Sequence, residues 1–171
     1  AFAAREGFNL TYTPFFIHAA VEAIKRYPIV NVSVDGTDVL WKDAINIGCA
    51  VALENGLIVP VVKGAGERNI LGLSKAIQDV ADRARAKKLN PDEVHGGTFT
   101  ITNPGNFGAQ FGLPIINQPQ VAILGVGSIE TRPVVIDDMI GIRLMGYLTL
   151  GYDHRLIDGA VADQFMADVK K

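Results

Sequence analysis

The sequence has little of several features that define common classes of protein. Cys49 is its only cysteine, so an internal disulfide is impossible and a reducing compartment is expected. The 16 basic residues do not outnumber the 18 acidic ones, and a net charge of -2 gives no reason to expect nucleic acid, whose binders usually present a basic face. The apolar stretch 57–62 stops at Lys63, far short of a membrane span. We therefore expect a soluble protein with no nucleic-acid or membrane partner.

Several catalytic motifs are missing as well. The three histidines, His18, His95 and His154, are far apart and none has the H-x-x-x-H spacing, so we expect no metal site. The pairs Gly64-Ala-Gly66 and Gly125-Val-Gly127 lack the third glycine of a dinucleotide fingerprint. No G-x-S-x-G elbow of a serine hydrolase occurs.

What the sequence does contain is enough apolar material for one domain. The 171 residues are 49% hydrophobic, which is sufficient for a core without disulfides or metals. Only 20% of the residues are charged, so part of the apolar surface is expected at subunit contacts. Cys49 lies in an alternating apolar segment, which predicts an inert, buried thiol.

Three segments have the periodicity of helices. Thr13 and Pro14 predict a helix start, with threonine as N-cap, and Pro28 ends the pattern. The stretch 71–89 repeats apolar residues on one face, and a third apolar pattern follows Gly159 to the end of the chain.

The segments between these helices predict strands. Asp35-Gly36 is typical of a hairpin turn, and Pro60 favours an edge or irregular position for its strand. Strict alternation of apolar residues predicts one strand from Ile140 to Leu150. The expected strands are 29–34, 39–41, 45–53, 57–62, 98–102, 121–126 and 140–150, with a structured loop over 105–119. Because strands and helices interleave irregularly, we expect an α+β fold with a mixed β-sheet and packed helices.

The strongest chemical signal is the segment 153–159, Asp-His-Arg-Leu-Ile-Asp-Gly, between a strand and the last helix. Loops on rigid elements are where catalytic groups concentrate. The same residues have a purely structural interpretation, in which His154 is a hydrogen-bonded core histidine and Asp158 caps the helix. Taken alone, the segment leaves both interpretations open.

This heptapeptide resembles the D-H-R-x-x-D-G signature of dihydrolipoamide acyltransferases, the E2 components of 2-oxo acid dehydrogenase complexes, at all five specified positions. Similar segments occur in order along nearly the whole chain: Gly56-Leu-Ile-Val-Pro-Val61, Thr98-Phe-Thr-Ile-Thr-Asn103, Pro114-Ile-Ile-Asn117 and Pro119-Gln-Val-Ala-Ile123. The resemblance implies a two-layer sandwich like that of chloramphenicol acetyltransferase. It also implies that residues 1–171 are a single, partial acyltransferase catalytic domain, without the lipoyl and peripheral-subunit-binding domains.

The resemblance implies transfer of an acyl group between the dihydrolipoyl thiol and coenzyme A. His154 would be the general base, because a histidine near pKa 6.5 suits a thiol near pKa about 8.5. Thr102 would donate to the oxyanion of the tetrahedral intermediate. Asp158 would hold the loop by pairing with an arginine expected in a preceding segment, which this chain does not identify.

The resemblance also implies partners. Coenzyme A would be a diffusible substrate, and lipoate would arrive on a separate lipoyl domain. The chain would form a homotrimer within a larger core, with His154 of one copy facing Thr102 of the next, and would meet the E1 and E3 components through the absent domains. The expected location is the cytoplasm, or the mitochondrial matrix in a eukaryote.

Two alternatives remain. A chloramphenicol acetyltransferase-like enzyme shares the H-x-x-x-D-G spacing, although that relative carries a histidine where Asp153 stands here. A non-catalytic assembly core is the second alternative, and the retained His154 argues against it. The acyl group, whether acetyl, succinyl or branched-chain, is left open by the sequence.

Overall fold

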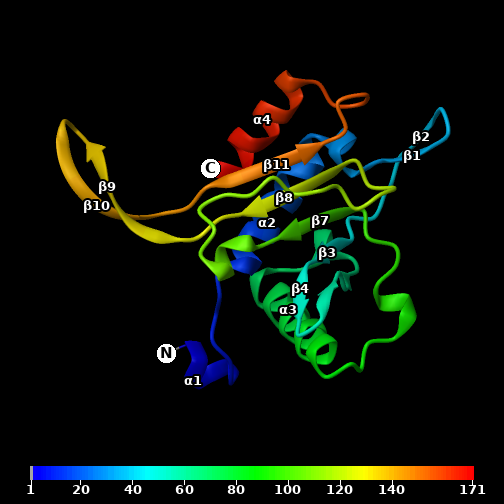
Figure 1. Cartoon of the computed structure of the whole chain (residues 1–171), viewed down its shortest axis with the longest axis horizontal. Coiled ribbons are helices and arrows are strands. Elements are labelled where there is room, and N and C mark those ends of the chain that lie inside the picture. The colour runs from blue at the N-terminus through cyan, green and yellow to red at the C-terminus, as the bar shows by residue number, and fades with distance from the viewer. Residues whose placement is uncertain (1) are drawn as a thin grey trace.

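A five-stranded mixed sheet forms the centre of the molecule in the computed structural model, which describes residues 2–171 (Figure 1). Its strand order is β11-β8-β7-β3-β6, in which β7 runs parallel to β3 and β8, while β6 and β11 are antiparallel to their neighbours. The strands are β3 (Ile47–Cys49), β6 (Val61–Val62), β7 (Phe99–Thr102), β8 (Ala122–Val126) and β11 (Leu148–Tyr152). The expectation of an α+β fold with a mixed sheet is confirmed.

Three helices make the second layer. They are α2 (Thr13–Arg26), α3 (Ile70–Arg85) and α4 (Gly159–Lys170), and a short α1 (Phe2–Glu6) lies near the N-terminus. In Figure 1, α2 lies behind the central strands, α4 beside β11 and α3 beside β4. Within residues 2–171, no helix combines the length and the apolar character that crossing a membrane requires.

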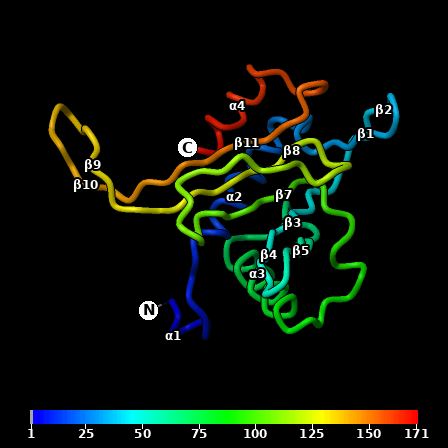
Figure 2. Tube along the Cα trace, in the orientation of Figure 1, coloured from blue at the N-terminus to red at the C-terminus, as the bar shows by residue number. Residues whose placement is uncertain are grey.

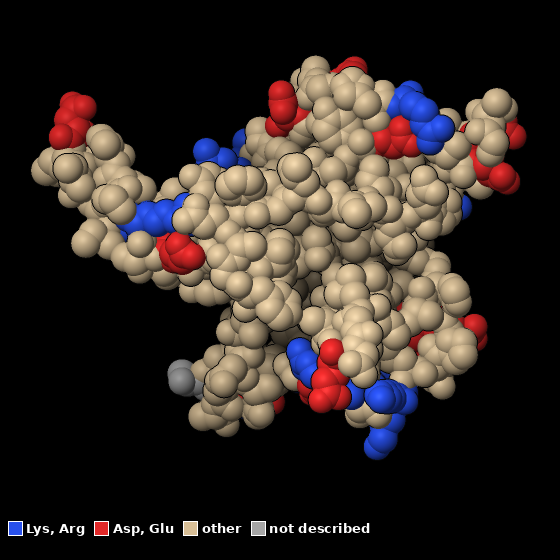
Figure 3. Space-filling model, in the orientation of Figure 1, with Lys and Arg blue, Asp and Glu red and all other residues tan. Residues whose placement is uncertain are grey.

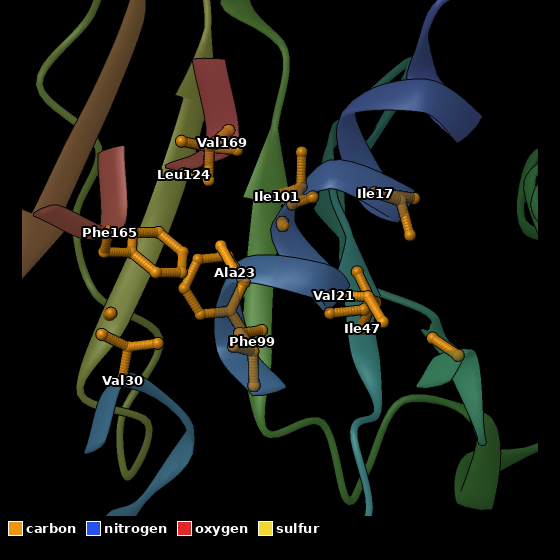
Figure 4. Packing of buried hydrophobic residues seen from close by; sticks show 14 of the residues in the cluster. Ile17, Val21, Ala23, Val30, Ile47, Phe99, Ile101, Leu124, Phe165 and Val169 are labelled. Atoms are coloured by element: carbon orange, nitrogen blue, oxygen red, sulfur yellow. The ribbon is translucent and has the colours of Figure 1, made fainter. Parts of the chain in front are cut away.

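The core lies between the sheet and these helices (Figure 4). Phe99 and Ile101 of β7 point towards the helices, and the ring of Phe99 lies 5.9 Å from that of Phe165 in α4. Because side chains alternate along a strand, Thr100 and Thr102 take the opposite face of the sheet. The fold therefore places the Thr102 side chain opposite those of Phe99 and Ile101, at the end of β7.

Three two-stranded ribbons and four short 3₁₀ turns connect these layers. Figure 2 shows the β9–β10 ribbon projecting from the body beyond the ends of β8 and β11. The ribbons are β1 (Ser33–Asp35) with β2 (Asp38–Leu40), β4 (Val51–Leu53) with β5 (Gly56–Ile58), and β9 (Glu130–Ile136) with β10 (Met139–Met145). The turns are η1 (Pro28–Asn31), η2 (Ala65–Glu67), η3 (Pro91–Glu93) and η4 (Pro104–Phe107).

The helix ends differ slightly from the sequence predictions. Tyr12, and not Thr13, occupies the N-cap position of α2, so Pro14 is the second helical residue. The helix expected to reach Leu89 ends at Arg85, because Lys87 adopts a positive φ of 56° that helical backbone does not allow.

Four strand predictions are wrong in extent. The segments 45–53 and 57–62, each expected as one strand, are both divided between the central sheet and the β4–β5 ribbon. The segment expected to be extended from Ile29 begins with the 3₁₀ turn η1, since Pro28 opens such a turn readily. The single strand expected from Ile140 to Leu150 is two strands, β10 and β11, which belong to different sheets and are separated by Gly146 and Tyr147. The edge position predicted from Pro60 is confirmed, because β6 is the last strand of the sheet.

Candidate active site

The signature segment forms a turn that is fixed at both ends. Asp153 follows β11 directly, and its carbonyl oxygen accepts hydrogen bonds from the Leu156 and Ile157 amides at 3.1 and 3.0 Å. Ile157 is 1% exposed and anchors the turn in the core. Asp158 then starts α4 by accepting a 2.8 Å hydrogen bond from the Val161 amide.

His154 lies exposed on this turn, so the interpretation as a core histidine is wrong. Its ring lies against that of Tyr152, with 5.4 Å between centroids and 38° between planes. Within residues 2–171, neither ring nitrogen of His154 has a hydrogen-bond partner. Both nitrogens are therefore available to exchange a proton with a bound molecule.

An ion pair joins Asp153 and Arg155, the residues immediately before and after His154. The Arg155 guanidinium donates to both carboxylate oxygens of Asp153, with its shortest contact at 2.6 Å, and the Arg155 amide donates to the same carboxylate at 3.0 Å. These hydrogen bonds from Arg155 hold the pKa of Asp153 below its usual value, so the carboxylate stays ionised. The pair also borders a cavity of about 190 Å³, whose lining is Val34, Ile116, Gln118, Pro119, Gln120, Asp153 and Arg155.

Asp158 acts as the N-cap of α4, which confirms the structural interpretation of this residue. No basic side chain within residues 2–171 forms an ion pair with it. Pairing with an arginine from a preceding segment stays a prediction.

Thr102 is the last residue of β7 and is partly buried. The hydroxyls of Thr98, Thr100 and Thr149 all donate hydrogen bonds, to Asn46 O, to Gln120 Oε1 and to Gly112 O. The Thr102 hydroxyl has no partner among residues 2–171. It lines a cleft of about 450 Å³, together with residues that include Cys49, Ile77, Arg85, Ile101 and Asn103.

The segment after Thr102 is held tightly against the sheet. Asn103 accepts a 3.2 Å hydrogen bond from the Asn106 amide, and the Ser128 amide donates to Ala109 O at 2.8 Å. A Cβ placed on Gly105 would lie 2.3 Å from the Ser128 nitrogen. Only glycine therefore allows this close approach, which fixes the path of the chain beside Thr102.

One chain does not bring Thr102 and His154 together. Thr102 pairs with Gly125, which pairs with Thr149, so these residues form a row across three strands. Since β11 carries the chain onward through Tyr152 to His154, the two groups lie at least about 10 Å apart along the strands alone. A general base acts at hydrogen-bond distance, so one copy of the chain cannot supply both groups to one reacting atom.

Two further observations concern Cys49, which the sequence predicted to be inert, and Tyr152, for which no prediction was made from the sequence. Burial raises the pKa of the Cys49 thiol to about 12, which confirms the prediction of an inert thiol. Tyr152 was missed, although it ends β11 only two residues before His154, whose ring lies against its own. Within residues 2–171, no three histidine, cysteine, aspartate or glutamate side chains gather closely enough to hold a metal ion.

The family follows from comparison with known proteins. A family model described as 2-oxoacid dehydrogenases acyltransferase (catalytic domain) matches residues 1–171. The chain belongs to this family. Family members among curated proteins are the acetyltransferase component of the pyruvate dehydrogenase complex of Mycobacterium tuberculosis (50% identical), the branched-chain lipoamide acyltransferase of Bacillus subtilis (46%) and the succinyltransferase of Cupriavidus necator (44%). These matches cover 94–100% of this chain but only 32–41% of the relatives, so the chain spans well under half of their length.

Solved catalytic cores of the family have the same fold. A probable dihydrolipoamide acetyltransferase from Listeria monocytogenes is 44% identical with a TM-score of 0.95, and the match covers 99% of this chain and 72% of that one. The cubic core of a pyruvate dehydrogenase complex is 37% identical with a TM-score of 0.92, covering 98% and 70%. A chloramphenicol acetyltransferase, 14% identical with a TM-score of 0.57 over 98% of this chain and 79% of that one, shows likeness of fold alone.

One solved relative bears directly on the site residues. The dihydrolipoamide acetyltransferase of Azotobacter vinelandii is 36% identical with a TM-score of 0.92, over 98% of this chain and 70% of that one. The structure concerns the catalytic roles of a serine, a histidine and an asparagine, which are separated by 52 and 4 residues. In the chain described here, residues 102, 154 and 158 are also separated by 52 and 4.

Proposed function

We propose that this catalytic domain transfers an acyl group between the dihydrolipoyl thiol and coenzyme A, with His154 as general base. The observation that carries the proposal is an exposed imidazole, free of hydrogen bonds within residues 2–171, on a turn fixed by the core and by α4. The spacing of Thr102, His154 and Asp158, identical to that of the residues studied in the Azotobacter enzyme, supports the same set of groups.

The chemistry follows from the free ring nitrogens of His154. One nitrogen takes the proton of the attacking thiol, and the resulting thiolate forms a bond to the thioester carbonyl carbon. When the tetrahedral intermediate collapses, the old carbon–sulfur bond breaks and the imidazolium returns its proton to the departing sulfur. Because the exchange is thiol for thiol, one histidine serves both directions.

The oxyanion of that intermediate needs a donor, and the Thr102 hydroxyl is free to supply one. Since Thr102 and His154 lie at opposite ends of the sheet, the site requires His154 from one copy and Thr102 from a neighbouring copy. Asp158 supports the reaction by fixing the start of α4 and with it the turn that carries His154.

The surface of the chain supports such an assembly. The isolated chain exposes 10246 Å², whereas a monomer of 18.3 kDa is expected to expose about 8100 Å². The excess is larger than the roughly 800 Å² that each partner buries in a standard interface. Figure 3 shows a broad uncharged area on the side of the molecule that faces the viewer, with the charged side chains mostly near its rim. The most exposed large apolar residues are Phe107, Leu113, Ile115, Val135 and Ile140.

We place the domain in the core of a 2-oxo acid dehydrogenase complex. Its substrates there are coenzyme A and a lipoyl group on a separate domain, and its copies form trimers within the larger core. The similarity to the cubic core of a pyruvate dehydrogenase complex supports assembly of this kind. The relatives include acetyl, succinyl and branched-chain enzymes at 44–50% identity, so the acyl group is to be chosen by assay.

The test removes the imidazole from the complete protein that contains this chain. We expect His154→Ala to lower transfer from acetyl-, succinyl- or isobutyryl-coenzyme A to dihydrolipoamide by roughly a hundredfold or more. His95→Ala is the matched control, because His95 is also exposed but lies in the loop before β7. Wild-type turnover by the His154→Ala protein would remove this residue from the mechanism.

A further inference from the structure

Tyr152 links the candidate base to the core of the protein. It is the last residue of β11, pairs in register with Ala122 of β8, and packs half-buried against the hydrophobic core. The tyrosine oxygen reaches the beginning of α4, where it lies 4.0 Å from the position of a Cβ on Gly159. The tyrosine ring is therefore held by the sheet and also lies near the start of the helix that follows the catalytic turn.

The imidazole of His154 makes no hydrogen bond within residues 2–171. A general base is usually oriented by a third group that hydrogen-bonds its second nitrogen. Here the nearby carboxylates are engaged elsewhere, Asp153 with Arg155 and Asp158 with the Val161 amide. Within residues 2–171, the aromatic partner of the imidazole is the Tyr152 ring, at 5.4 Å between centroids and 38° between planes.

We propose that Tyr152 is a positioning residue for the acyl transfer, which orients the His154 imidazole through the contact between the two rings. The proposal rests on the proposed function, because it assumes that His154 is the base. An aromatic ring limits rotation of the imidazole without taking up either nitrogen, so both remain free for the proton transfer.

This role depends on the ring and not on the hydroxyl, which determines the choice of variants. Tyr152→Phe keeps the ring, whereas Tyr152→Leu and Tyr152→Met remove it and retain an apolar side chain for the core. Leu150→Ala is the structural control, because Leu150 lies on the same strand and the same side, packs against the same core and carries no aromatic ring. The kcat, the KM for each thiol substrate and the thermal midpoint are measured for each variant of the complete protein.

We expect Tyr152→Phe to keep kcat within about twofold of the wild type. Tyr152→Leu and Tyr152→Met should each lower kcat by about tenfold or more, because small misplacements of a catalytic group are costly, while KM for both substrates changes little. Leu150→Ala should lower the thermal midpoint at least as much as the Tyr152 variants, with kcat close to that of the wild type.

Two outcomes would overturn the proposal. Either the ringless variants turn over as fast as Tyr152→Phe, or Leu150→Ala at matched stability loses as much kcat as they do. A failure of the proposed function looks different, since the wild type would then show no transfer or His154→Ala would be fully active. If only one ringless variant folds, that variant alone decides between the outcomes.

Discussion

Replacing Asp158 separates its role as a helix cap from a role that needs its charge. Its carboxylate accepts one hydrogen bond, of 2.8 Å, from the Val161 amide at the start of α4. Loss of such a cap costs about 1 kcal/mol, and in a domain of 171 residues this corresponds to roughly 2–4 °C in thermal midpoint. We expect Asp158→Ala to lose this amount, while Asp158→Asn and Asp158→Ser retain most of it because both keep an oxygen acceptor.

Calorimetry of the three variants, together with the transfer assay, tests this reasoning. We expect Asp158→Asn to retain turnover as well as stability, since the Azotobacter enzyme has its asparagine at the corresponding spacing. An unchanged thermal midpoint in Asp158→Ala would refute the capping argument. A stable but inactive Asp158→Asn protein would show that the negative charge is needed, as pairing with an arginine requires.

Two further predictions concern the loop after α3 and the segment beside Thr102. Two hydrogen bonds from the Arg83 guanidinium lower the pKa of Glu93 from 4.5 to about 2, so its contribution to stability is present above pH 4.5 and lost as the pH falls through about 2. Glu93→Gln should therefore lower the unfolding free energy at pH 7, and urea denaturation should find the difference from wild type closing towards pH 2; a constant difference would contradict this. Gly105→Ala forces the chain away from Ser128 and should lower transfer by about tenfold or more, whereas Gly141→Ala, with its nearest contact at 3.4 Å, should leave kcat unchanged. Full activity of the Gly105→Ala protein would show that the position of this segment does not matter.

The spacing of apolar residues, together with the positions of glycine and proline, was sufficient to predict most helices and strands. The apolar face expected along the stretch 71–89 appears as the buried face of α3. One strand was predicted over 140–150 where there are two. Ile140 and Leu150 are both even-numbered and therefore fit one alternating pattern, although they lie in different sheets. The alternation of side chains indicates which residues share one side of a strand, but it does not indicate which neighbouring strand they pair with.

The site was only partly visible in the sequence. The signature around His154 pointed to the correct turn, and its exposure and fixed ends could not be read from residue types. The separation of Thr102 from His154 depends on strand order, which the sequence does not encode locally. The contact between Tyr152 and His154 had a local signal, namely their spacing of two residues at the end of a strand.

The central claim is that His154 and Thr102 act together only across two copies of the chain. We would prepare the His154→Ala and Thr102→Val proteins separately, then unfold and reassemble them as an equal mixture. Random mixing leaves about one site in four with both intact groups if each site draws on two neighbouring copies. We predict recovery of roughly a quarter of the wild-type transfer rate, from two inactive parents; a mixture that reassembles fully and stays inactive would contradict a shared site.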